Sequence, residues 1–314
     1  MRRSASPLSL TLLGLGVFLL VLAPMLAFYV EPRAKRTPID VDQTTVLTGT
    51  GSYFDQESVR VREDQKLTVT RRVLGNVEVS TENDVAAWEV STTIDNPDTL
   101  KLADPRKSFQ WTTERWVTDR ATNRPVHCCD EGPTRFSGDA YLKFPFDVQE
   151  RGYRWWDSTL GGAVPLTYEE RAEVDGYEGL RFTGSVDATR TGSRQVPGAL
   201  VGSSAPQVMA EEWYANDNIE LIVDEATGRI LKATIGPRVT LRAPGADEDA
   251  VTLLHSDALT FTDETVENQV ELASADSGRL RLVGTTAPLG AGIAGAVLAA
   301  VGGFLVVRGR PGPR

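Results

Sequence analysis

Two long uncharged stretches, LSLTLLGLGVFLLVLAPMLAFYV (8–30) and APLGAGIAGAVLAAVGGFLVV (287–307), stand near the two ends of this 314-residue chain. An α-helix rises about 1.5 Å per residue, so roughly 20 apolar residues cross a hydrocarbon core about 30 Å thick. Neither stretch carries the polar stripe expected of a surface helix in a soluble protein. We therefore predict two transmembrane helices, 8–30 and 287–307, with one large polar segment, 31–286, between them.

A cleaved signal peptide is the alternative for the first stretch, because Arg2 and Arg3 form a basic region before it. However, its apolar run exceeds the usual signal-peptide length of about 7–15 residues. Met25 also occupies a place before Ala27 where signal cleavage needs a small residue. We expect an uncleaved anchor.

Two membrane spans place both chain ends on the same side of the bilayer. Lys and Arg residues flank the spans on both sides in nearly equal numbers, so their count does not decide the orientation. The basic start of the chain, before a signal-like first helix, favours cytoplasmic ends. We predict a cell-membrane protein with residues 1–7 and 308–314 in the cytoplasm and residues 31–286 outside it.

The charge balance of the chain argues against a nucleic-acid partner. It carries 43 acidic and 33 basic residues, for a formal net charge of −10, and an acidic surface repels phosphate backbones. No metalloprotease, nucleophile-elbow, P-loop or dinucleotide-binding motif occurs in the sequence. We therefore predict a protein that is not an enzyme and has no cofactor or metal.

Only two histidines, His127 and His255, are available as imidazole bases. His255 stands beside Ser256 and Asp257, but neighbours in sequence do not form a catalytic relay, which is a spatial arrangement. We expect His255 to be exposed or satisfied locally.

The polar segment has the period-two pattern of β-strands. Trp88, Val90, Thr92 and Ile94 share one face of their stretch, and Glu89, Ser91 and Thr93 share the other. Turn signals follow at Asp175-Gly176 and at 224–228, and several short strands with regular turns are typical of an antiparallel sheet. We predict a mainly β extracytoplasmic domain, antiparallel, with a curved sheet or a sandwich-like arrangement, between the two transmembrane helices.

Three segments interrupt this β pattern. Residues 31–40 contain two prolines and are predicted to be a linker that ends the first helix. Residues 190–206 are rich in Gly, Ser and Pro and predict a long loop or a subdomain boundary. Outside the spans, residues 205–215 are the one weak candidate for an amphipathic helix.

The stretch HCCDE (127–131) contains both cysteines of the chain. As a metal site it offers His127, Cys128, Cys129 and Asp130 in a row, whereas zinc ligands are usually spaced so that the chain wraps the ion. As a redox site it lacks the Cys-x-x-Cys spacing. In an oxidising compartment we favour a disulfide between Cys128 and Cys129, with an intermolecular bond or two buried thiols as alternatives.

The second apolar stretch contains a repeat of small residues. Ala291, Gly295, Ala299 and Gly303 recur every four residues and form one face suited to close helix packing. This face would meet the first span or a second copy of the chain. The alternative is that these residues are ordinary apolar filler.

Several stretches together resemble a known family. They are the N-terminal span, TTVLTGTGSYFD (44–55), the Cys-Cys pair, YLKFPFDVQERGYRWWDSTLGGAVPLTYEERAEVDGYEGLRF (141–182) and the Asp-x-x-Thr-Gly turn at 224–228. They resemble the actinobacterial porin PorA family, long catalogued as a domain of unknown function, over essentially the whole chain. The resemblance implies a cell-envelope protein, with channel formation attributed to some members, and supplies no catalytic residues.

The sequence therefore supports more than one function. A PorA-like envelope protein that contributes to a channel or to envelope transport is the first hypothesis. An anchored domain that binds or holds a lipid or envelope component is the second, and an accessory subunit of a membrane complex is the third. The expected partners are the lipid bilayer and either further copies of the chain or another envelope protein.

Overall fold

The computed structural model describes residues 7–132 and 135–308, and the chain forms two compact units. Among the described residues, the helical unit comprises 7–36 and 275–308, and the β domain comprises the rest, from Thr37 to Ser274. The predicted cytoplasmic ends lie outside the described residues except for residues 7 and 308.

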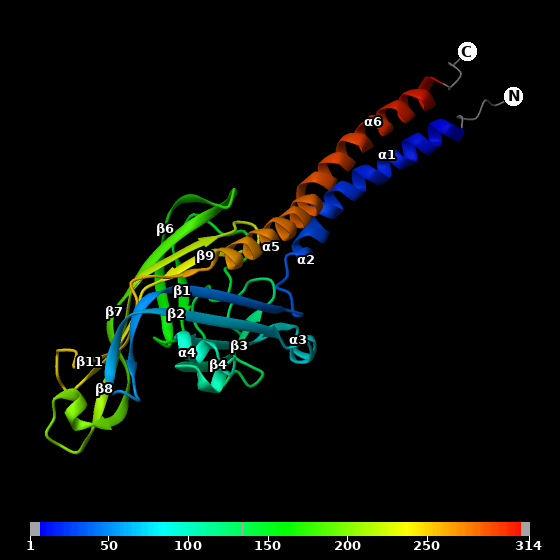
Figure 1. The fold of residues 1–314 in the computed structure, drawn as a ribbon. Helices are drawn as coiled ribbons and strands as arrows, with labels where there is room; N and C mark the ends of the chain where they lie inside the picture. The colour runs from blue at the N-terminus through cyan, green and yellow to red at the C-terminus, as the bar shows by residue number, and fades with distance from the viewer. Residues whose placement is uncertain (1–6, 133–134, 309–314) are drawn as a thin grey trace, which may run out of the picture. The chain divides into compact units, whose positions relative to one another are not determined.

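The helical unit contains two long apolar helices packed against each other (Figure 1). Leu13 lies against Gly302 and Gly16 lies against Ala299, so residue numbers rise along one helix as they fall along the other, and the two helices are antiparallel. The unit contains α1 (Pro7–Met25), η1 (Leu26–Val30), α2 (Glu31–Ala34), the end of α5 (Asp263–Arg281), η4 (Leu282–Thr286) and α6 (Ala287–Arg308).

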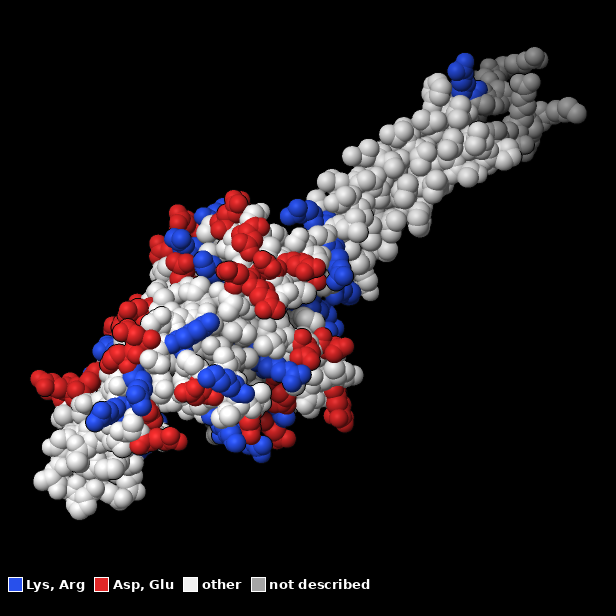
Figure 2. Space-filling view, in the orientation of Figure 1, with Lys and Arg blue, Asp and Glu red and all other residues white. Residues whose placement is uncertain are grey.

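Both apolar helices are long enough to cross a bilayer. Within the described residues, Pro7–Ala34 and Asp263–Arg308 each contain an apolar window of spanning length. Figure 2 shows a long stretch of this unit without charged side chains. The chain thus has two candidate membrane spans, as predicted.

The prediction that a linker begins at residue 31 was wrong, because the helical backbone continues to Ala34. Pro32 is the second residue of α2 and has no backbone N–H to donate. The preceding π-helical turn lets the Glu31 N–H donate to the Leu26 carbonyl instead. The proline is therefore accommodated without ending the helix.

The β domain is built on one antiparallel sheet of twelve strands. The sheet order is β4-β3-β2-β1-β11-β10-β8-β7-β6-β5, with β9 and β12 bridging β8 and β1. The strands are β1 (Asp42–Asp55), β2 (Arg60–Gly75), β3 (Val85–Asp95), β4 (Gln110–Asp119), β5 (Tyr153–Asp157), β6 (Gly162–Val174), β7 (Tyr177–Pro197), β8 (Gln207–Val223), β9 (Ile230–Ile235), β10 (Pro237–Arg242), β11 (Val251–His255) and β12 (Leu259–Phe261). Four short helices, α3 (Val77–Asn83), α4 (Pro97–Leu100), η2 (Pro105–Lys107) and η3 (Gly198–Val201), connect strands.

The sheet curls around a single main core. Leu67 on β2 and Leu166 on β6 stand far apart in the strand order, yet both belong to the same buried cluster. Phe144, Phe182 and Leu221 also belong to this cluster and are almost completely buried. The interior of the curled sheet is thus filled with side chains, and the predicted antiparallel, curved β domain is confirmed.

The two edge strands, β4 and β5, are brought together by residues 135–152, which we call the crossing segment. Its Phe136 and Tyr141 pack in a second buried cluster with Trp116 of β4 and Trp156 of β5. Further along, the Phe144 N–H donates to the Gly228 carbonyl at 2.7 Å. This segment contains the sequence KFPFD (143–147), crosses the interior and closes the gap between the sheet edges.

The predicted turns are confirmed. Asp175 and Gly176 have positive φ angles of 48° and 77° between β6 and β7, in a two-residue hairpin. In the turn between β8 and β9, the Asp224 carboxylate accepts hydrogen bonds from the Thr227 backbone N–H and hydroxyl. Asp-Gly suits the first turn because both residues need positive φ.

Two local predictions were wrong. Residues 207–215, inside the weak helix candidate 205–215, belong to β8, which pairs with β7 on one side and β10 on the other. Residues 190–197, expected in a loop, are the last residues of β7. In both places, pairing with strands distant in sequence overrides the local composition.

One helix outside the apolar stretches was missed. The first part of α5 packs Val266 and Ala273 against Ile222 and Leu231 of the sheet. Acidic residues open the helix and arginines close it, and its apolar residues recur at helical spacing. The charged ends and the helical spacing of the apolar residues were present in the sequence. They were missed because few apolar residues stand among many polar ones.

Candidate functional site

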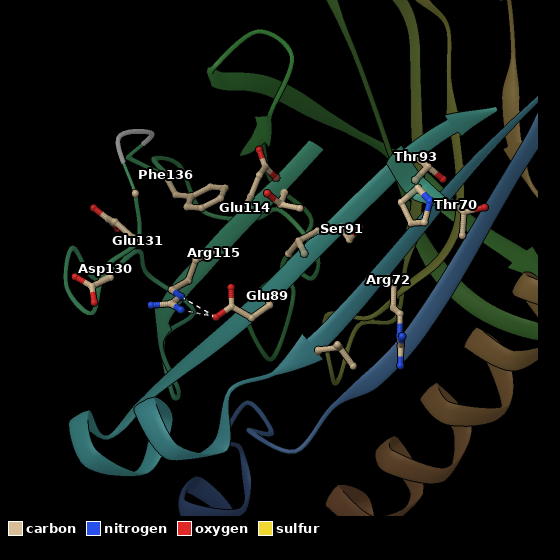
Figure 3. Close-up of a pocket in the computed structure, with 15 residues that line it drawn as sticks. Thr70, Arg72, Glu89, Ser91, Thr93, Glu114, Arg115, Asp130, Glu131 and Phe136 are labelled. Atoms are coloured by element: carbon tan, nitrogen blue, oxygen red, sulfur yellow. Dashed lines mark hydrogen bonds and ion pairs between the residues drawn. The ribbon is translucent and has the colours of Figure 1, made fainter. Parts of the chain in front are cut away.

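A groove of about 670 Å³ lies over β2, β3 and β4 (Figure 3). The sheet forms its floor, Pro105 lines one part of it, and residues 130–132 and 136 line another. We call it the β2–β4 groove. Most of its lining residues are polar or charged, although apolar atoms contribute the larger part of its surface. The lining residues are Thr70, Arg72, Leu74, Glu89, Val90, Ser91, Thr93, Pro105, Thr113, Glu114, Arg115, Asp130, Glu131, Gly132 and Phe136.

The strand register places three cross-strand rows on the groove face of the sheet, and every residue in them except Trp111 lines the groove. Side chains that alternate along a strand share one face, and antiparallel pairing aligns the same face of neighbouring strands. The rows are Thr70–Thr93–Trp111, Arg72–Ser91–Thr113 and Leu74–Glu89–Arg115. The polar face predicted for Glu89, Ser91 and Thr93 is therefore the floor of this groove.

Arg115 is fixed by two partners. Its Nε donates to the Glu89 carboxylate at 2.8 Å, and its Nη1 donates to the backbone carbonyl of Cys129 at 2.6 Å. Only 23% of the Arg115 side chain is exposed, so this ion pair is better shielded from solvent than most surface pairs. The guanidinium links the groove floor to the loop that carries both cysteines.

That loop, residues 126–132, is the cystine loop, because Cys128 and Cys129 form a disulfide. Cys129 and Asp130 both have left-handed backbone conformations, with φ of 62° and 57°. The two cysteines pack against a small buried cluster of Val85, Ala87 and Val117. The disulfide predicted from the sequence is thus present, and it directs the Cys129 carbonyl toward Arg115.

His127 and Asp130 do not join the cysteines as metal ligands. The His127 Nδ1 lies 2.9 Å from the Glu131 carboxylate, and both sulfurs are in the disulfide. Within residues 7–132 and 135–308, no group of three His, Cys, Asp or Glu side chains has the geometry to hold a metal ion.

A second hydrogen-bonded set lies at the inner side of β4. Glu114 accepts hydrogen bonds from the Tyr141 hydroxyl at 2.6 Å and from the Ser158 hydroxyl at 2.9 Å. Burial raises the pKa of Tyr141 well above its usual range, so this phenol remains a donor at physiological pH. The contact ties the crossing segment to the strand that lines the groove.

On the floor and nearby, arginines are paired with carboxylates. Arg72 makes a bidentate contact with Asp42 on the neighbouring strand, at 3.1 and 3.2 Å. The hydrogen bond from Arg72 lowers the pKa of the Asp42 carboxyl, which stays ionised at neutral pH. The groove thus presents both donors and acceptors in fixed positions, and that arrangement suits a ligand that both donates and accepts hydrogen bonds.

His255, the other histidine, is on β11. Its Nε2 lies 3.3 Å from Asp257, while the neighbouring Ser256 hydroxyl donates to the Thr50 carbonyl at 2.8 Å. The serine hydroxyl is therefore engaged with the backbone and not with the histidine, and these three residues do not form a catalytic relay.

The small residues singled out on α6 do not all take the same position. Gly295 and Ala299 lie against α1, with Gly295 beside the Gly16 carbonyl and Leu20. Gly302, and not Gly303, forms the next close approach, because a Cβ on Gly303 would meet nothing within 4 Å. A helix has 3.6 residues per turn, so residues four apart do not stay on the same face. Over the repeat from Ala291 to Gly303, the last position therefore turns away from α1.

The fold and the groove define a class of protein: a β domain with a polar groove, carried between two apolar helices of spanning length. The profile of the Porin PorA family matches residues 8–304, and the chain belongs to that family. A comparison with curated proteins found no match. Family membership points to a channel or envelope role and leaves the specific function open.

Proposed function

We propose that this chain is a membrane-anchored cell-envelope protein, not an enzyme, whose β domain binds an envelope component in the β2–β4 groove. Both chain ends lie in the cytoplasm, and the β domain lies outside it. The two apolar helices act as anchors, and the disulfide suits an oxidising compartment on the outer side of the membrane.

The β2–β4 groove is the observation that carries this proposal. Its volume of about 670 Å³ is in the range of ligand sites. Its central arginine is held from two directions, by Glu89 and by the cystine loop. Side chains fixed before a ligand arrives lose little conformational entropy on binding, so this is the construction expected of a binding site.

The test compares the native ligand content of the full-length protein with that of a groove-filling variant. Thr113→Trp places an indole in the groove on an exposed strand position, whereas Thr112→Trp places it on the opposite face of the same strand. Native mass spectrometry should detect a co-purifying component in the wild type and in Thr112→Trp, and little of it in Thr113→Trp. Equal occupancy in all three, or none in any, contradicts the proposal.

A channel is the second candidate, favoured by the porin family. The packed core inside the curled sheet argues against a lumen through one β domain, and neither apolar helix contains an ionisable residue along its span. A pore would therefore need several copies of the chain. If this candidate is right, purified full-length protein in planar bilayers should give conductance steps that become more frequent as protein density rises. No conductance at any density rules it out.

A further inference from the structure

We infer that the β2–β4 groove binds a neutral saccharide, with Trp111 as the stacking platform. The inference rests on the proposed function, because it assumes that the groove is the binding site, and it names the chemical class of the ligand. Three observations carry it: an exposed and oriented indole, a mixed set of donors and acceptors, and the charge of the lining.

Trp111 stands beside the lining residues of the groove, on the same face of β4 and directly across from the lining residue Thr93. It is 46% exposed, which is unusual for the largest apolar side chain. Its Nε1 donates to the Ser91 hydroxyl at 2.9 Å, so the ring is held in place beside the groove floor. An indole that is exposed and yet fixed is available to a ligand with little loss of side-chain entropy.

The chemistry of an indole face suits a sugar ring. The face of an aromatic ring carries partial negative charge, and the C–H groups on the apolar side of a pyranose carry partial positive charge. Stacking these surfaces also removes apolar area from water. An aromatic platform beside polar side chains therefore matches a ligand that is apolar on its ring face and polar around its rim.

The polar part of the groove matches the rim of such a ligand. A sugar hydroxyl both donates and accepts hydrogen bonds, and adjacent hydroxyls require both functions close together. The Arg115–Glu89 pair places a guanidinium donor beside carboxylate acceptor oxygens, and the guanidinium hydrogens not used for Glu89 and the Cys129 carbonyl remain for a ligand. The hydroxyls of Thr70, Thr93 and Thr113 line the same groove and can reverse their roles.

The charge of the lining selects against anionic ligands. The lining contains two arginines, Arg72 and Arg115, and four carboxylates, Glu89, Glu114, Asp130 and Glu131. Each arginine is already paired with a carboxylate. A phosphate or sulfate would therefore meet net repulsion, whereas a neutral polyol would meet none.

The experiment is a titration of the full-length protein with a panel of defined ligands. The panel contains neutral oligosaccharides of hexoses and of pentoses, an oligomer of amino sugars, and inorganic phosphate. The protein is held in a detergent without a sugar head group, because a maltoside or glucoside would compete for the groove. Binding is measured by isothermal calorimetry and by tryptophan fluorescence.

We expect at least one neutral oligosaccharide to bind. Trp111→Ala should weaken its binding about tenfold or more, and Trp111→Phe, which keeps an aromatic face, should weaken it less. Thr112→Ala, on the opposite face of β4, should bind like the wild type. Trp111 is exposed on an edge strand, so its removal leaves the core intact.

The outcomes separate this inference from the proposed function. Binding of phosphate or of the amino-sugar oligomer in preference to every neutral sugar overturns the inference, as does saccharide binding that Trp111→Ala leaves unchanged. If no saccharide binds but Thr113→Trp still displaces a co-purifying component, the inference is wrong and the groove remains a binding site. If Thr113→Trp displaces nothing and no saccharide binds, both are wrong.

Discussion

Lys143 carries an amine into the interior of the β domain. Its Nζ lies 4.0 Å from the centre of the Phe146 ring and, among the described residues, meets no hydrogen-bond acceptor. Burial and the nearby Arg229 lower the pKa of Lys143 to about 7. The crossing segment therefore contains a lysine that is largely uncharged at mildly alkaline pH.

This amine makes stability depend on pH in a defined direction. Between about pH 7 and pH 10.5 the unfolded chain binds the lysine proton and the folded chain does not, so the free energy of unfolding rises as pH rises through this window. Lys143→Met removes the buried amine and should raise the free energy of unfolding at pH 7 by about 2–4 kcal/mol. Its stability should also vary less than that of the wild type over the same window.

The measurement is the thermal midpoint of wild type and Lys143→Met in detergent, at intervals from pH 6 to pH 11. The two curves should converge at high pH, where the amine is neutral in both folded and unfolded wild-type protein. Parallel curves across the whole range would show that Lys143 is charged in the folded state.

The cystine loop predicts a local effect of reduction rather than a global one. A bond between neighbouring residues closes so short a loop that its chain-entropy contribution is only about 1 kcal/mol. The Cys128→Ser, Cys129→Ser double variant should therefore lose only about 2–4 °C of thermal midpoint. It should lose more ligand affinity, because the Cys129 carbonyl no longer holds Arg115.

Calorimetry of unfolding and of ligand binding on the same samples checks this prediction. A separate measurement of intact mass should find the wild type as a monomer, two hydrogens lighter than its reduced form. Arg115→Lys provides the comparison, because it keeps the charge and cannot bridge Glu89 and Cys129 in the same way. Complete unfolding of the double variant would contradict a purely local role for the disulfide.

At the scale of elements, the β8–β9 turn determines where the crossing segment runs. Gly228 has a φ of 73°, and a Cβ on it would overlap the carbonyl oxygens of Phe144 and Pro145. Gly176 has a similar φ of 77°, but a Cβ there would meet nothing within 4 Å. The two glycines separate the cost of a left-handed backbone from the cost of a steric clash.

Gly176→Ala should lower the free energy of unfolding by about 1–2 kcal/mol, the cost of a left-handed alanine. Gly228→Ala should lower it by at least about 2 kcal/mol more, because the crossing segment must move away from the turn. Chemical denaturation of both variants in detergent measures the difference. Equal losses would mean that the crossing segment shifts without cost.

The contact of α1 with α6 offers a similar matched pair. Gly302 lies against Leu13, whereas its neighbour Gly303 has open space where a side chain would be. Small residues let membrane helices approach closely and gain van der Waals contact. Gly302→Leu should therefore separate the two helices, and Gly303→Leu should leave the pair intact.

The separation is measured by energy transfer between fluorophores attached at two exposed positions, Leu8→Cys and Phe304→Cys. Sodium dodecyl sulfate is added stepwise to part the two helices. The midpoint should fall in Gly302→Leu and remain near that of the parent in Gly303→Leu. A larger effect of Gly303→Leu than of Gly302→Leu would contradict the close approach at Gly302.

At the scale of the whole molecule, the proposed orientation in the membrane is open to a direct test. With cytoplasmic ends, the cystine loop lies outside the cell membrane, and its thiols are blocked until reduced. A membrane-impermeant maleimide should label intact cells only after treatment with a reductant. Labelling that requires lysis of the cells would place the β domain in the cytoplasm.

Much of the architecture follows from sequence patterns that act locally. The uncharged runs at 8–30 and 287–307 are long enough to span a bilayer whatever surrounds them, and the alternation from Trp88 to Ile94 produces a strand with one polar face. Asp175-Gly176 sets a hairpin because few other residue pairs accept two positive φ angles. The disulfide also has only one possible intramolecular pairing, since the chain has two cysteines.

The site was decided by contacts between residues that are distant in sequence. The strand register places Thr93 across from Trp111 and Glu89 across from Arg115, and no local pattern specifies which strands become neighbours. The KFPFD motif was visible in the sequence, but its role in closing the sheet edges depends on Phe144 reaching Gly228 across the interior. Local chemistry thus determined the two apolar helices, many of the strands, the predicted turns and the cystine. Only the tertiary structure decided the end of β7, the start of β8 and the groove, because each of these depends on long-range pairing.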